Sequence, residues 1–352
     1  MLYAFGSNGS GQLGLDDSND RSKPEQCLFP AEYESEVPVS IAAGGNHTLV
    51  LLQSGKVLSA GSNARHQRGE TLTGTPSLGF GGLSILTVGQ RLEIFKACST
   101  TWESTTLVTH ADDVYTFGAG AKGELGQGEH ITESRPHQTP SFPPIGSTIS
   151  DISSSMGHTV VVLSNGEVFG WGQGRKGQLG EPAGIVWSPR RISNIPFAAV
   201  RAVCGKDFTY IVGLPDTGQH LLLGPDKRKI CSSAPDRVQG WKDIGASWGS
   251  IFVLLCDGRL ISWGRNDHGQ IPAPNLPKLS KIAAGSEHCL GLTAHGEVLA
   301  WGWGEHGNCG LPIKPEGDTE RSWNMIDVDN SRGVHVTGVW TGCATSWISA
   351  EL

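Results

Sequence analysis

Three histidines occupy the same place in a repeated pattern, and histidine is the side chain that most often acts as an acid, a base or a metal ligand near neutral pH. They are His47, His158 and His288, each following a glycine-containing turn. A residue that recurs at one position of successive units is better explained by structure than by a single reaction centre. We therefore expect a ring nitrogen of each to hydrogen-bond a neighbouring loop, unit after unit.

Other patterns that could carry chemistry are incomplete. The eight cysteines stand singly, without a Cys-x-x-Cys pair or a cysteine–histidine cluster at zinc spacing, which favours reduced and mostly buried thiols. No Gly-x-Ser-x-Gly elbow links a strand to a helix. The glycine-rich run 9–14 recurs in several units and opens no expected helix, so it does not predict a phosphate site. The sequence predicts no catalytic residue, cofactor or metal.

Composition excludes further classes. The 352 residues carry a formal charge of −7 with no Lys/Arg-rich run at either end, which argues against direct nucleic-acid binding. No apolar stretch reaches the roughly 18 residues of a membrane span, and the first residues lack the features of a secretory signal. We expect a cytoplasmic or nuclear protein.

Internal repetition organises the whole chain. A short strand ending in glycine recurs seven times, at Phe5-Gly6, Ala60-Gly61, Phe117-Gly118, Trp171-Gly172, Leu223-Gly224, Trp263-Gly264 and Trp301-Gly302. A turn-and-anchor block recurs with anchors at positions 47, 105, 158, 208, 250, 288 and 345. Seven units of about 50 residues result. The indoles of Trp171, Trp263 and Trp301 belong to a repeat column and are expected in the core.

Each unit reads as a hairpin that needs neighbours. Two apolar runs flank a turn such as Ser164-Asn165-Gly166, and such turns favour residues that adopt positive φ. The last unit lacks a strand ending in glycine, whereas the chain begins with one, at residues 2–6. Pairing the two ends removes the open edge. We predict an all-β fold, a seven-bladed β-propeller spanning 1–352 as a single domain, closed by N- and C-terminal strands in one blade.

These residues resemble the regulator of chromosome condensation repeat family, a superfamily of seven-bladed propellers. The run from Trp171 to Gly180 and the Gly-x-His-Thr anchor carry the match, which covers the whole chain. Within the family, residues 5–9, 301–310 and 342–348 are similar to the fungal alpha-tubulin suppressor group, associated with killer-toxin insensitivity and Elongator. The chain departs from the family pattern where the anchor is Thr105, Ser250 or Thr345. Residues 80–90 look like an insertion.

That resemblance implies a partner and a pathway. Members of the group form a heterodimer with a small CSL-type zinc-finger protein that carries electrons. The pair supports Elongator in modifying the wobble uridine of tRNA, and it supports the enzymes of diphthamide synthesis on elongation factor two. The resemblance thus implies a non-enzymatic, regulatory scaffold.

The informative positions are those where the turn column breaks. Equivalent turns of a propeller lie on one face around the axis, so the residues just before the anchors should ring one end of the shaft. Large aromatic residues in surface turns are better explained by a partner than by folding. We therefore expect a partner-binding ring of Trp102, Lys206, Asp207, Trp248 and Glu287. The alternative is that the indoles simply plug the shaft.

A second group of candidates follows the last repeat tryptophan. Trp303 is an extra aromatic residue, and Asn-Cys replaces the usual Gln-Leu at 308–309. By resemblance, this segment is a contact surface specific to the group, formed by Trp303, Glu305, His306 and Asn308.

Two other functions remain open on sequence grounds. By fold analogy the chain could be a guanine-nucleotide exchange factor for a Ran-like small GTPase. That activity needs a protruding wedge, and usually a basic tail, and neither is identifiable here. A metal- or cofactor-dependent enzyme is the third possibility, and bound metal in the purified chain would reveal it.

Overall fold

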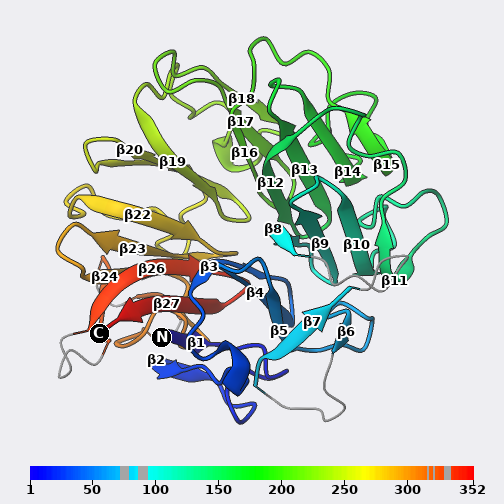
Figure 1. Ribbon diagram of the computed structural model, residues 1–352. Coiled ribbons are helices and arrows are strands. Elements are labelled where there is room, and N and C mark those ends of the chain that lie inside the picture. Colours follow the sequence, from blue (N-terminus) through cyan, green and yellow to red (C-terminus); the bar gives the residue numbers. More distant parts are fainter. Residues whose placement is uncertain (72–78, 86–93, 315–316, 320–321, 329–333) are drawn as a thin grey trace.

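The strands form seven antiparallel sheets that stand around a central axis (Figure 1). The computed structural model describes residues 1–71, 79–85, 94–314, 317–319, 322–328 and 334–352. We number the sheets as blades 1 to 7 in the order of their anchors. The all-β, seven-bladed propeller predicted from the repeats is confirmed.

The first three blades contain the longer sheets. Blade 1 comprises β3 (Pro38–Ala43), β4 (His47–Leu52), β5 (Val57–Gly61), β7 (Gly81–Ser84) and β6 (Glu70–Thr71). Blade 2 comprises β8 (Phe95–Thr100), β9 (Ser104–Thr109), β10 (Val114–Ala119) and β11 (Glu133–Gln138). Blade 3 comprises β12 (Ile149–Ser155), β13 (His158–Leu163), β14 (Val168–Gly174) and β15 (Gly184–Arg191).

The remaining blades complete the ring. Blade 4 has β16 (Arg201–Cys204), β17 (Thr209–Val212) and β18 (His220–Leu223), and blade 5 has β19 (Trp241–Ala246), β20 (Ser250–Leu255) and β21 (Leu260–Gly264). Blade 6 has β22 (Leu279–Ala284), β23 (His288–Thr293), β24 (Val298–Gly302) and β25 (Asn324–Ile326). Blade 7 has β26 (His335–Thr341), β27 (Thr345–Glu351), β1 (Leu2–Gly6) and β2 (Arg21–Gln26). Two 3₁₀ turns are η1 (Ala31–Tyr33) and η2 (Lys227–Lys229).

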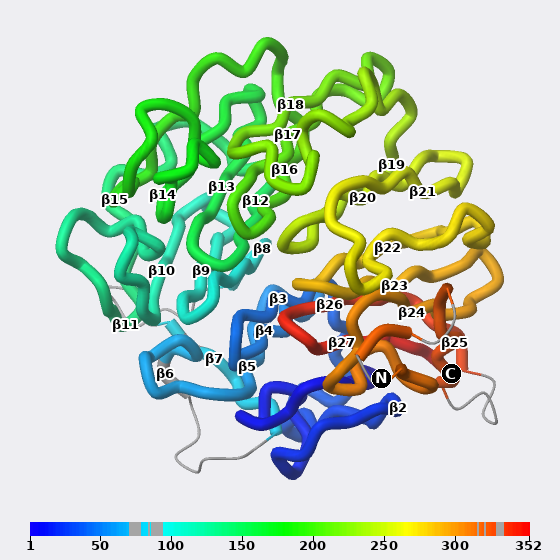
Figure 2. Tube along the Cα trace, turned by 180° about the vertical axis from the view of Figure 1, so that it is seen from behind, coloured from blue at the N-terminus to red at the C-terminus, as the bar shows by residue number. Residues whose placement is uncertain are grey.

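Blade 7 is built from both ends of the chain, as predicted. Strand β1 pairs antiparallel with β27, with Ala4 opposite Trp347 and Gly6 opposite Thr345. The amino group of Met1 donates to the carbonyl of Ala350 at 2.8 Å. The two ends therefore lie side by side, as both views of the ring show (Figures 1 and 2).

The hairpins form where the sequence places glycine. Gly55, Gly166 and Gly258 have φ of +83° to +85° in the turns between second and third strands, a conformation that other residues rarely adopt. The second strands that these turns follow, such as β4 and β13, are buried along their whole length. Each blade therefore hides both faces of its central strands against its neighbours.

The core lies between blades. In one cluster, Val108 of blade 2, Val161 of blade 3 and Ile211 of blade 4 are all buried and packed in a continuous apolar layer. Trp171 and Trp301 are fully buried and Trp263 is nearly so, which confirms their expected place in the core.

The expected insertion falls in blade 1. Part of it forms β7, which pairs with β5 as an outer strand, Leu58 opposite Gly82. The rest of that expectation, residues 86–90, lies outside the described residues.

Candidate protein interface

The histidines of the repeated column tie neighbouring blades together. His158 Nε2 of blade 3 lies 3.0 Å from Thr209 Oγ1 of blade 4, and Thr209 donates its own proton to the carbonyl of Gln178 at 2.7 Å. A hydroxyl has one proton, so the imidazole must be the donor, with its proton on Nε2. The same arrangement recurs at two other interfaces, as His47–Thr105–Gln67 and His288–Ser346–Asn308.

Burial keeps these rings uncharged. It lowers the pKa of His47 to about 3 and the pKa values of His158 and His288 to about 4. The expected structural role is thus confirmed, but the expected partner, a loop in every blade, is wrong: the histidines bond strand hydroxyls, and they do so at three interfaces. Within the described ranges, no group of three or more His, Cys, Asp or Glu residues is placed to hold a metal ion.

Three other interfaces use an indole in place of the histidine. The Nε1 atoms of three tryptophans donate to carbonyls of the preceding blade at 2.8–3.0 Å, in the pairs Trp171–Glu124, Trp263–Ile230 and Trp301–Gln270. The interface between blades 7 and 1 has neither bond among the described residues. There the indole of Trp347 packs in the core with Val50 and Leu58.

Strand pairing corrects the anchor of the second unit. His47 pairs with Gly61 and His288 with Gly302, and in blade 2 the residue opposite the equivalent Gly118 is Ser104. The anchor is therefore Ser104 and not Thr105. Because no residue is inserted, Trp102 stands directly two positions before its anchor.

The turns before the anchors form a ring at one end of the shaft, as the repeat predicted. Five of the seven turns donate a backbone N–H to the next turn at 2.8–3.1 Å, in the links Gly45–Trp102, Trp102–Met156, Lys206–Trp248, Trp248–Ser286 and Ser286–Gly342. The candidates Trp102, Lys206, Asp207, Trp248 and Glu287 consequently share one face.

Trp102 and Trp248 meet although they come from blades 2 and 5. Their ring centroids are 6.1 Å apart, and both line a shaft cavity of about 280 Å³ together with small residues of all seven blades. Trp102 nevertheless remains 38% exposed. The two indoles therefore lie together in the shaft, as in the alternative considered above, and Trp102 also presents aromatic surface to solvent.

A pocket of about 280 Å³ joins the two groups of candidates. Its apolar walls include Trp248 of blade 5, Trp303 of blade 6 and Phe208 of blade 4. Lys206 stands at the rim, with Nζ 5.0 Å from the centroid of the Trp248 ring. Five candidates thus line one pocket: Lys206, Asp207, Trp248, Glu287 and Trp303.

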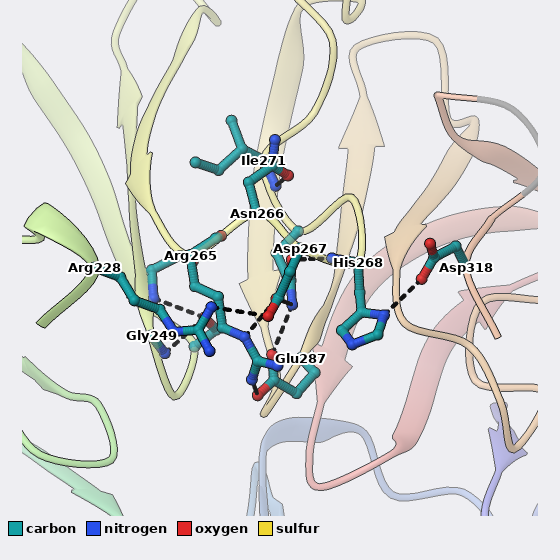
Figure 3. Close-up of polar contacts among 12 residues, drawn as sticks. Arg228, Gly249, Arg265, Asn266, Asp267, His268, Ile271, Glu287 and Asp318 are labelled. Carbon is teal, nitrogen blue, oxygen red and sulfur yellow. Dashed lines mark hydrogen bonds and ion pairs between the residues drawn. The ribbon is translucent and has the colours of Figure 1, made fainter. Parts of the chain in front are cut away.

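Charged residues of the pocket wall, Arg228, Arg265 and Glu287, belong to a network of polar contacts that Figure 3 shows. Arg265 contacts both Asp267 and Glu287, and Arg228 reaches Asp267 at 2.8 Å. Gln270 donates to Glu287 at 2.8 Å. Burial raises the pKa of Glu287, and the hydrogen bond from Gln270 and the Arg265 charge oppose that rise.

Trp303 is positioned by a stack that the sequence did not indicate. Its ring lies parallel to His268, with centroids 4.9 Å apart and an interplanar angle of 13°. His268 Nδ1 lies 2.9 Å from Asp318 Oδ1, as Figure 3 shows. The indole is therefore held face-on between a histidine and the pocket.

The other candidates of the second group are dispersed. Glu305 is exposed, and His306 Nδ1 lies 3.0 Å from Asp20 Oδ2 of blade 7. Asn308 is only 1% exposed, its amide donates to the Trp303 carbonyl, and its own carbonyl accepts from Ser346. The expectation that Asn308 belongs to a contact surface is wrong, because its side chain is used inside the fold.

A larger hollow, of about 560 Å³, lies on the other side of Trp102. It is lined by charged residues from blades 1 to 4, including Lys122, Glu124 and Lys176. Glu124 replaces the glutamine found at this turn position in blades 1, 3, 5 and 7, and burial raises the pKa of its carboxyl. Among the residues described, no helix is long and apolar enough to cross a membrane.

Comparison with known proteins relates this chain to proteins with RCC1 repeats. A family model described as RCC1-like domain matches residues 1–348. An RCC1 repeat-containing protein of Schizosaccharomyces pombe is 31% identical over 380 residues, which cover 100% of this chain and 99% of that protein. The ultraviolet-B receptor UVR8 of Arabidopsis thaliana is 25% identical over 393 residues, covering 99% of this chain and 84% of the receptor.

Solved structures agree on the fold. Prp20p from Saccharomyces cerevisiae matches with a TM-score of 0.83 at 19% identity, covering 99% of this chain and 91% of that chain. Human WBSCR16 matches with a TM-score of 0.81 at 18% identity, with both chains covered completely. At these identities the likeness concerns architecture alone.

Proposed function

The chain belongs to the RCC1-like repeat family, and from this premise we propose that it is a non-enzymatic scaffold holding a protein partner at the ring of turns. The proposed partner is a small CSL-type zinc-finger electron carrier, bound as a heterodimer. Through this partner the scaffold supports wobble-uridine modification by Elongator and diphthamide synthesis on elongation factor two, in the cytoplasm or nucleus. The resemblance to the alpha-tubulin suppressor group motivates this choice of partner.

One observation carries the proposal: three indoles outside the repeat core column gather at the same end of the ring. Trp102, Trp248 and Trp303 come from blades 2, 5 and 6, and line the shaft mouth and the adjoining pocket. These three indoles are not needed for the repeated core position, because Trp171 and Trp301 are the tryptophans that are buried there. Partly exposed aromatic residues beside a pocket are the side chains that most often dominate binding energy at interfaces.

The charged residues at this end support binding over catalysis. Arg265 forms ion pairs with Asp267 and Glu287, and the carboxylate of Asp207 forms an ion pair with Lys176 at 2.8 Å. Groups held in mutual ion pairs fix a surface and its charge pattern, and are poorly placed to exchange protons with a substrate.

Titration calorimetry with a purified, zinc-loaded CSL-type protein tests the proposal. We expect a one-to-one complex, and at least a tenfold loss of affinity, about 1.4 kcal/mol, on Trp248→Ala or Trp303→Ala. Leu214→Ala is the matched control, since Leu214 is 58% exposed in the turn between β17 and β18 at the opposite end. Absence of a complex would refute the proposal. Accelerated nucleotide release from a Ran-like GTPase would favour the exchange-factor alternative instead.

A further inference from the structure

The loop that follows β18 in blade 4 departs from every other unit. Other blades have a Gly-x-Leu-Gly or related turn here, with glycines such as Gly123 and Gly177 at φ near +80°. Blade 4 has Pro225 to Ser232, which contains three consecutive basic residues, Lys227 to Lys229. The carboxylate of Asp226 fixes the loop by accepting the N–H groups of Cys231 and Ser232 at 2.8 and 3.1 Å.

Two of these basic residues adopt a backbone conformation that glycine would adopt more easily. Arg228 has φ +58° and Lys229 has φ +61°. Non-glycine residues in the left-handed region cost conformational energy, and they tend to persist where the side chain has a task. For Arg228 that task is visible, because its guanidinium reaches Asp267 beside the pocket (Figure 3). Lys227 and Lys229 are exposed on either side of it.

The pocket beside this loop is apolar inside and positive at its rim. Its volume of about 280 Å³ lies below the range of pockets that enclose a whole small ligand, and suits one large side chain. Four cations line it against two carboxylates, in a chain whose net charge is −7. Lys206 forms no ion pair among the described residues and stands over Trp248, while Lys227 only approaches Asp207, at 3.8 Å.

We propose that this pocket and the loop 225–232 bind an acidic, extended segment of a protein partner. One aromatic or large aliphatic side chain of the segment lies between Trp248 and Trp303. Carboxylates flanking that side chain meet Lys206, Lys227 and Lys229. The proposal rests on the proposed scaffold function and specifies the chemistry that its partner presents.

The fixed carboxylates favour a protein segment over a nucleic acid. Asp207, Asp267 and Glu287 stand among the cations and would repel a continuous line of phosphates. A peptide can leave gaps in its charge opposite these groups, and its apolar anchor gains from burial against the two indoles.

Fluorescence anisotropy of the full chain tests the proposal with labelled dodecapeptides. The probe carries Asp and Glu around a central Leu-Trp pair. Comparison peptides replace Leu-Trp by Ala-Ala, or replace the acids by lysines. We expect saturable binding of the probe only, weakening at least tenfold when salt rises from 50 to 300 mM. The double change Lys206→Glu with Lys227→Glu should weaken binding at least tenfold, and Trp303→Ala likewise.

Lys278→Glu is the matched charge control, because Lys278 is exposed next to Gly258 at the opposite end of the ring. The zinc-finger protein is titrated in parallel, so that the two proposals can fail separately. If the probe binds as described and the zinc-finger protein does not bind, the acidic-segment site is supported and the zinc-finger protein is refuted as the partner. If the zinc-finger protein binds equally well to the Lys206/Lys227 double variant and the probe does not bind, the docking chemistry is overturned. Tighter, equally lysine-dependent binding of a labelled oligouridylate would assign the site to nucleic acid and also overturn it.

Discussion

His158 Nε2 of blade 3 donates a hydrogen bond of 3.0 Å to the hydroxyl of Thr209 in blade 4, and that hydroxyl donates one to the Gln178 carbonyl. The hydroxyl thus joins a side chain and a backbone group of the previous blade at one point. Equivalent hydroxyls act at two more interfaces, and indoles at three. The ring is therefore fastened by side chains that lie far apart in the sequence.

Replacing Thr209 by valine should destabilise the fold by about 2 kcal/mol, because His158 Nε2–H and the Gln178 carbonyl would both lose a buried partner. Thr48 offers the matched control: it has the same place in blade 1 and is equally buried, but its hydroxyl has no partner. Thr48→Val should leave the free energy of unfolding unchanged or raise it. Urea denaturation of both variants measures the difference, and equal losses would contradict the assigned bonds.

Stability should fall as the pH is lowered from about 6.5 toward 4. The pKa values of His47, His158 and His288 are depressed in the folded state, to about 3 or 4, whereas an unfolded histidine titrates near 6.5. In that window the unfolded chain binds protons that the folded chain does not, so each histidine costs up to about 1.4 kcal/mol per pH unit. Denaturation at pH 7, 6 and 5 measures the slope.

His158→Gln should reduce that slope by about one proton, whatever it does to stability at pH 7. His110→Gln, at an exposed position, serves as the control and should leave the slope as it is. An unchanged slope in the His158 variant would contradict the neutral, buried state of the ring.

Glu124→Gln should stabilise the protein at pH 7 by about 1 kcal/mol, the scale of one buried polar interaction. Burial raises the pKa of this carboxyl, so the charged form is disfavoured above that pKa and the penalty is relieved in acid. A glutamine can still accept the Lys122 N–H, as Gln178 accepts that of Lys176 at 2.9 Å. Thermal unfolding should show a smaller gain at pH 4 than at pH 7. A loss at pH 7 would mean that the carboxylate has a favourable partner.

Gly45→Ala should disturb the shaft mouth. A methyl group at Gly45 would lie 2.7 Å from Cε2 of Trp102, so the indole must move. We expect a several-fold loss of affinity for the zinc-finger partner with little change in melting temperature. Gly9→Ala is the control, since nothing lies within 4 Å of its added methyl. Titration calorimetry compares the two, and identical affinities would exclude Trp102 from the interface.

The sequence was sufficient to predict the closed propeller and the common face of its anchor turns. Both follow from counting the repeats and from the strand that the last unit lacks. The sequence also contained a pattern that indicates the hydrogen bonds between blades, although the repeat analysis did not detect it. Where the anchor is histidine, the next unit has a hydroxyl one residue after its own anchor, as with His288 and Ser346. Aligning neighbouring units, and not only equivalent ones, would have revealed this relation and moved the second anchor to Ser104.

Other features could not be inferred from repetition. The stack of Trp303 on His268 depends on two loops from different blades, and nothing in either segment alone specifies it. Asn308 was misplaced because its departure from the usual glutamine was interpreted as a contact residue, whereas Asn308 is buried like that glutamine and bonds groups inside the fold. The loop at 225–232 matched no repeat, so its position beside the pocket emerged only from the structure.

The pairing of β1 with β27 has a consequence for biosynthesis. The ribosome delivers the first strand some 340 residues before its partner strand, which at 5 to 20 residues per second is a delay of roughly 20 to 70 s. During translation, the leading strand carries unpaired amides and carbonyls that could add to any other exposed sheet. A nascent chain of this design needs either shielding by chaperones or rapid completion, and the finished ring is the first state in which the ends protect each other.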